Sequence, residues 1–118
     1  MSNQRFPSAV RTATFVGDDN PASISGERLT LVLDVTVVPG VDTVTPIIEG
    51  KDALSGKYYT VLQGTAMAAT GTQVLTVAPG IAAVANVSAS APIPKIYRMR
   101  VIHSAGTNFI WSLSGTET

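Results

Sequence analysis

The chain has 118 residues, of which 45% are hydrophobic, 14% charged and 6% aromatic, with no cysteine, one histidine and no net formal charge. This length suits one domain, and the apolar content is too high for a disordered chain. The absence of thiols excludes disulfides and cysteine-ligated metal sites. Balanced charge disfavours a nucleic-acid partner, because such binding depends on neutralising phosphates.

The first strand-like pattern covers residues 9–16, and the clearest covers 29–37, where Leu and Val alternate with more polar residues until Pro39-Gly40. A strand at 43–49 contains Pro46, which predicts a sheet edge or a bulge there. Ser55-Gly56 is a plausible hairpin turn before the next strand. In chain order, the predicted strands are 9–16, 29–37, 43–49, 57–63, 73–77, 95–103 and 108–113.

Residues 104–107 form a short segment of small residues, Ser-Ala-Gly-Thr, so the last two predicted strands are expected to form a hairpin. About seven short strands predict an all-β fold: a single-domain antiparallel β-sandwich, Ig-like or jelly-roll-like, with a small β-barrel as the alternative. We expect residues 1–8 to be an extended N-terminal arm and residues 9–118 to form the sandwich.

Charge is unevenly distributed along the chain. Up to Asp52 there are seven acids and four bases, a net charge of −3, and after it four bases and one acid, a net charge of +3. We expect the two signs to pair within the fold; the alternative is that copies pack acidic face against basic face.

Residues 58–94 contain no Asp, Glu, Lys or Arg. Gly, Pro and amide residues interrupt every window that might span a membrane, and no signal-peptide-like segment follows Met1, so no membrane partner is expected. The run therefore predicts strands and loops buried in the core or against a partner. Within it, residues 64–71 carry Met67 on a loop of small residues, which suits either another subunit or the loop's own sandwich.

Groups suited to catalysis are scarce. His103 lies on an otherwise apolar strand and is expected to be a half-buried, hydrogen-bonded side chain. Asp18, Asp19 and Asn20 offer oxygen ligands for a weak calcium site, but they also suit an ordinary turn. We predict a protein that is not an enzyme and has no cofactor or metal.

Aromatic and basic side chains raise two binding hypotheses. Arg98 and Arg100 share one strand face near tyrosines, which permits base stacking, but pairing with Asp34 or Glu49 on the next strand is favoured. Trp111 suits a sugar-stacking platform or, more commonly in an alternating apolar strand, the core.

Two segments, LDVTVVPGVDTVTPIIEGKDALSGKYYTVLQGTA (33–66) and YRMRVIHSAGTNFIWSLS (97–114), resemble small β-rich structural proteins of tailed-phage virions. The resemblance implies a capsid decoration protein on the virion surface, made in the host cytoplasm. Its partners are then the major capsid protein and neighbouring copies, as a dimer or trimer. The candidate contact residues are Arg5, Phe6, Met67, Arg98 and Arg100.

Two alternatives remain open. One is a carbohydrate-binding or adhesin sandwich, which predicts that Trp111 or the pair Tyr58 and Tyr59 is exposed. The other is a tail or neck subunit, which predicts ring assembly by the isolated chain.

Overall fold

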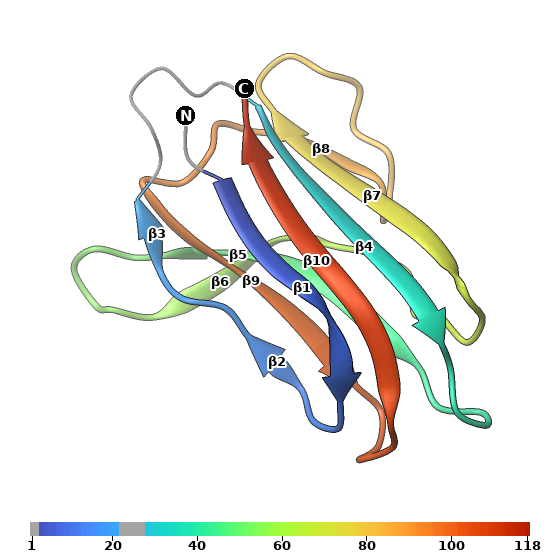
Figure 1. Ribbon diagram of the computed structural model, residues 1–118. Helices are drawn as coiled ribbons and strands as arrows, with labels where there is room; N and C mark the ends of the chain where they lie inside the picture. The colour runs from blue at the N-terminus through green and yellow to red at the C-terminus, as the bar shows by residue number, and fades with distance from the viewer. Residues whose placement is uncertain (1–2, 22–27) are drawn as a thin grey trace.

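The structure, a computed structural model, describes residues 3–21 and 28–118, which form strands and their connections without a helix. Ten strands are present in these ranges (Figure 1). They are β1 (Asn3–Arg11), β2 (Phe15–Val16), β3 (Asn20–Pro21), β4 (Leu29–Val37), β5 (Val44–Lys51), β6 (Tyr58–Gln63), β7 (Gly71–Ala78), β8 (Ser88–Ser90), β9 (Ile96–His103) and β10 (Phe109–Glu117).

The strands form two sheets packed face to face (Figure 1). Sheet A has the order β1-β10-β4-β7-β8, and sheet B has the order β2-β9-β5-β6, with β3 also paired to β9. All pairs are antiparallel except β7 with β8. The predicted antiparallel sandwich is confirmed, and the described strands do not close into the alternative barrel.

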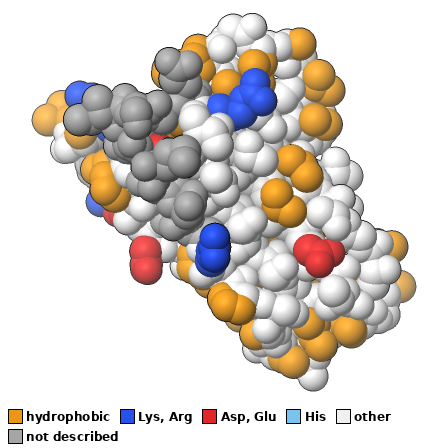
Figure 2. Space-filling model, turned by 45° about the horizontal axis from the view of Figure 1, so that its top comes forward, with side chains coloured by type: hydrophobic (Ala, Val, Ile, Leu, Met, Phe, Trp, Pro, Cys, Tyr) orange, Lys and Arg blue, Asp and Glu red, His pale blue; other side chains and the backbone are white. Residues whose placement is uncertain are grey.

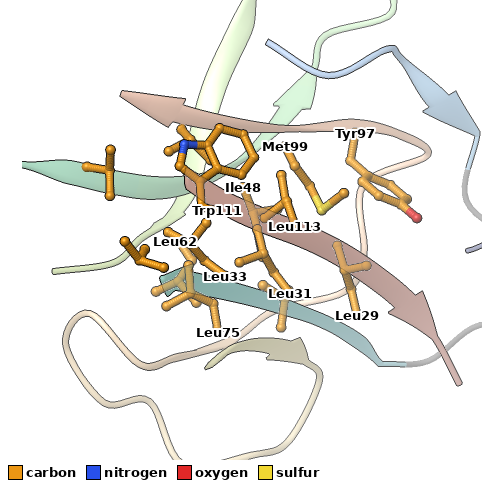
Figure 3. Packing of buried hydrophobic residues seen from close by; sticks show 14 of the residues in the cluster. Leu29, Leu31, Leu33, Ile48, Leu62, Leu75, Tyr97, Met99, Trp111 and Leu113 are labelled. Atoms are coloured by element: carbon orange, nitrogen blue, oxygen red, sulfur yellow. The ribbon is translucent and has the colours of Figure 1, made fainter. Parts of the chain in front are cut away.

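The core follows from period-two alternation. Leu29, Leu31 and Leu33 of β4 are fully buried, while the residues between them are only partly covered. Their side chains meet those of Tyr97 and Met99, which β9 contributes from sheet B (Figure 3). The burial of these large apolar side chains is the main source of stability in such a fold.

The N-terminal segment differs from the prediction. Residues 3–8 are not an arm outside the sandwich but belong to β1, which pairs with β10; residues 1 and 2 lie outside the described part. Phe6 anchors the segment, because its ring lies 4.7 Å from that of Phe15. The pairing is irregular between Phe6 and Ala9, so Pro7 occupies a place where a missing N–H is tolerated.

The predicted hairpin at 95–113 is wrong. β9 belongs to sheet B and β10 to sheet A, so their apolar faces meet across the core instead of lying side by side. The prediction for Pro46 is also wrong, because β5 lies between β9 and β6 and its irregularity falls at Ile48 and Glu49. Pairing with β6 starts at Ile47, so the N–H that Pro46 lacks is not needed there.

Candidate partner-binding surfaces

The run without charged residues, 58–94, builds one side of the sandwich. It contains β6, at an edge of sheet B, and β7 and β8, at an edge of sheet A, and β6 contacts both of them. Side chains join these edges: Asn86 Nδ2 donates to the carbonyl of Gln63 at 3.0 Å, and the side-chain amide of Gln73 bonds both backbone groups of Thr65. We call the surface formed by these residues the charge-free side, after its own residues; Arg28, from another segment, borders it beside Pro79 and Ile81.

An apolar loop at 79–87 forms the outer part of the charge-free side. Val84 and Val87 are 49% and 50% exposed, and their neighbours are mostly alanines. Backbone hydrogen bonds hold the loop in one shape: Val84 N–H donates to Ser88 and Val87 N–H donates to Val84. Asn86 takes the left-handed conformation at φ 63°, as required by this tight turn.

Met67 also lies on the charge-free side, but it is only partly exposed. Its side chain packs against the core cluster, and its backbone exchanges hydrogen bonds with Val44 at 2.8 and 3.2 Å. The structure therefore uses this methionine to cover its own core, which leaves little of it for a neighbour.

Arg5 and Phe6 point to opposite faces of β1. Phe6 lies opposite Leu113 and faces the core, where it meets Phe15. Arg5 lies opposite Ser114 and is exposed on the outer face of sheet A. The structure thus separates the two proposed contact residues and leaves Arg5 as the accessible one.

Arg98 and Arg100 converge on Glu49 of the neighbouring strand. Arg98 Nε lies 2.7 Å and Arg100 Nη1 3.0 Å from the carboxylate, whose side chain is 8% exposed. This confirms the predicted pairing with Glu49. The alternative partner, Asp34, lies on the other sheet and accepts a hydrogen bond from Thr72 at 3.1 Å.

The ionic network extends to Lys51 and Tyr58, the last residue pair before the turn between β5 and β6. The Arg98 guanidinium lies 3.4 Å from the ring centre of Tyr58, which itself donates a hydrogen bond to Asp19 at 2.6 Å. Lys51 lies 3.1 Å from the same carboxylate. The hydrogen bond from Tyr58, and then that from Lys51, lower the pKa of Asp19. Asp19 therefore links β6 and the end of β5 to the segment before β3. The predicted turn is not found at Asn20, which is the first residue of strand β3.

The outer face of sheet A was not singled out by the sequence. Residues that alternate with the buried ones on β4, β7 and β10 project from it, and they are mostly small and uncharged (Figure 2). We call this surface the Ser/Thr face; it comprises Arg5, Thr30, Val32, Asp34, Thr36, Thr72, Val74, Thr76, Ile110, Ser112, Ser114 and Thr116. The sequence does contain one signal for this face. The positions of 29–37 that alternate with the buried ones are two threonines, one valine and a single acid, so the exposed side of this strand carries little charge.

The aromatic residues that suggested sugar binding are placed differently from one another. Trp111 is fully buried, as favoured above, so it offers no stacking platform. Tyr59 is 50% exposed and lies over Gly50, while Tyr58 is engaged by Arg98 and Asp19. Of these three aromatic residues, Tyr59 is the one whose ring is left accessible for stacking on a sugar.

His103 is buried and accepts a hydrogen bond from Trp111, so it forms part of the core boundary. Within residues 3–21 and 28–118, no three His, Cys, Asp or Glu side chains gather as a metal site. The same part of the chain has no helix of the length and apolarity that crossing a membrane requires.

Comparison with protein-family models finds no match, and comparison with curated proteins finds no similar sequence.

Proposed function

We propose that this chain is a non-enzymatic structural protein of a phage virion that decorates the capsid by docking its charge-free side on the major capsid protein. The observation that carries the proposal is the gathering of residues 58–94 on one side of the sandwich. Burying charged groups at an interface costs free energy, and interface centres are accordingly depleted of them. The ordered loop at 79–87 adds exposed valines that require no rearrangement before contact.

The sequence resemblance of segments 33–66 and 97–114 to phage structural proteins supports the same class of function. A capsid presents many equivalent sites, so each contact can be weak if neighbouring copies also touch one another. A small, cofactor-independent sandwich suits that role.

The experiment is cosedimentation of the purified chain with empty capsids assembled from the major capsid protein of the same gene cluster. The variant Val84→Lys/Val87→Lys places two charges on the charge-free side, and we expect it to bind at least about tenfold more weakly. Leu54→Lys is the matched control, because Leu54 lies in the turn between β5 and β6, outside residues 58–94, and is 96% exposed. Equal binding by both variants contradicts the proposed docking side, and no binding by the unmodified chain contradicts capsid decoration.

Carbohydrate binding is the second candidate, and the exposure of Tyr59 is the observation that favours it. It predicts that tyrosine fluorescence changes with added oligosaccharide and that Tyr59→Ala abolishes the change. A tail or neck role predicts instead that the isolated chain assembles into rings, which electron microscopy of the same sample detects.

A further inference from the structure

The Ser/Thr face carries two charged side chains of opposite sign, Arg5 and Asp34. Neither has an ion-pair partner among the described residues: the three salt bridges found there join Lys51 to Asp19 and the arginines of β9 to Glu49. Asp34 is held in place by the hydroxyl of Thr72. The face therefore presents one fixed acid and one free base near its middle. A second base, the exposed Arg28, lies beyond the start of β4, beside Thr118.

The register places these two charges symmetrically about the middle strand. Arg5 lies opposite Ser114 on β10, and Asp34 lies opposite Ser112 on the same strand. Arg5 and Asp34 are therefore two strands apart, roughly 10 Å across the sheet, and two residues apart along it, roughly 7 Å. The midpoint between them falls on β10, between Ser112 and Ser114.

We propose that the Ser/Thr faces of two copies pack against each other about a two-fold axis that passes over β10. Each Arg5 then lies opposite the partner's Asp34, and this pair occurs twice, as a two-fold interface requires. The small hydroxyl side chains of Ser112 and Ser114 occupy the centre and permit close approach of the two sheets. Val32, Val74 and Ile110 supply the apolar area around them.

The self-complementary charges favour a second copy over an unrelated partner. An identical face matches the acid and the base at once and at the same spacing, whereas an unrelated partner has to supply both signs in that arrangement. The dimer shares Thr72, Val74 and Thr76 of β7 with the charge-free side. The two proposals are still tested separately, because the capsid experiment changes the 79–87 loop and the dimer experiment changes Arg5 and Asp34.

Sedimentation equilibrium of the full chain, over a range from micromolar to near-millimolar concentration, tests the proposal. We expect a concentration-dependent dimer whose dissociation constant rises about tenfold or more in Arg5→Asp and in Asp34→Arg, because each creates two like-charge contacts. The double variant Arg5→Asp/Asp34→Arg restores the pairs with reversed sign and is expected to recover the dimer. Lys57→Asp, a charge reversal outside the face, is the control and leaves dimerisation unchanged.

Ser114→Arg provides a second test, because it places a large charged side chain at the proposed centre, directly opposite Arg5 on the neighbouring strand, while both members of the pair are retained; we expect it to give a monomer. Circular dichroism establishes that each variant is folded. A monomeric unmodified chain throughout the concentration range overturns the proposal. So does a double variant that dimerises no better than the single ones, or a Ser114→Arg chain that dimerises normally.

Discussion

The indole N–H of Trp111 donates a hydrogen bond to Nε2 of His103, 3.1 Å away, inside the sandwich. Because Nε2 accepts this bond, the proton of the neutral imidazole is on Nδ1. Arg11 of β1 lies 4.4 Å from the centre of the Trp111 ring, so a permanent positive charge already stands beside the pair. Burial, and then the charge of Arg11, lower the pKa of His103.

This arrangement predicts that the protein loses stability in mild acid. The unfolded chain binds a proton on His103 near its ordinary pKa of 6.5, whereas the folded chain resists it, so the free energy of unfolding falls as the pH drops below that value. We expect the urea midpoint to be constant above about pH 7 and to decline towards about pH 5. His103→Gln, which lacks the titrating group, is expected to remove the decline. The same decline in both proteins contradicts this explanation.

Glu49 is predicted to contribute strongly to stability. Glu49→Gln keeps the size of the side chain but removes the charge that Arg98 and Arg100 share, and hydrogen bonds to charged groups contribute about 1.5–3 kcal/mol each. Because both arginines are partly exposed, we expect less than the sum of the two bonds, about 1–2 kcal/mol in total, from chemical denaturation. Lys57→Gln removes an exposed charge and is the control. A variant as stable as the control contradicts a stabilising role of the network.

The success of the sequence-based predictions depended on whether the signal was local. The strand predicted at 29–37 coincides with β4, because alternation of apolar residues is a property of neighbouring positions. The pairing of the two β9 arginines with Glu49 was also accessible, since opposite charges at alternating positions favour adjacent strands.

Pairing between distant strands was not accessible in this way. Trp111 and Tyr97 both lie on alternating apolar strands, and such a pattern does not distinguish partners within a sheet from partners across the core. The Ser/Thr face depends on the order β10-β4-β7, which brings together three segments far apart in sequence. Serine and threonine on one strand carry no sign of a shared surface until that order is known.

Tyr97 predicts a loss of stability in alkali. Its hydroxyl donates to Glu117 at 2.8 Å and accepts from Asn20 at 2.7 Å, and burial, followed by the bond to Glu117, raises the pKa of Tyr97 far above its usual value. The unfolded chain ionises near the ordinary pKa of 10.0 while the folded chain does not, so stability is present below that pH and is lost as the pH rises through it.

We expect Tyr97→Phe to weaken this alkaline dependence, and to reduce the free energy of unfolding at neutral pH by about 1–3 kcal/mol because Glu117 loses a buried donor. Tyr59→Phe, at a half-exposed tyrosine, is the matched control and keeps the full alkaline slope. Urea titrations at neutral and alkaline pH measure both effects. An unchanged slope in Tyr97→Phe assigns the alkaline loss to other groups.

A side chain at Gly50 is predicted to destabilise the protein, because the ring of Tyr59 lies across this position. A Cβ atom at this position falls 2.5 Å from Cζ of Tyr59 and 2.9 Å from Cγ of Pro94. Gly50→Ala therefore has to displace a packed ring and a proline, and we expect a loss of about 1–3 kcal/mol.

Gly106→Ala is the control for Gly50→Ala, since its nearest contact, the carbonyl of Thr12, lies 3.4 Å from the added atom; we expect a change within about 0.5 kcal/mol. Repeating Gly50→Ala in a Tyr59→Ala background removes the ring, so the loss is expected to shrink towards the part due to Pro94. If the loss is the same in both backgrounds, the ring of Tyr59 is not what excludes a side chain from Gly50.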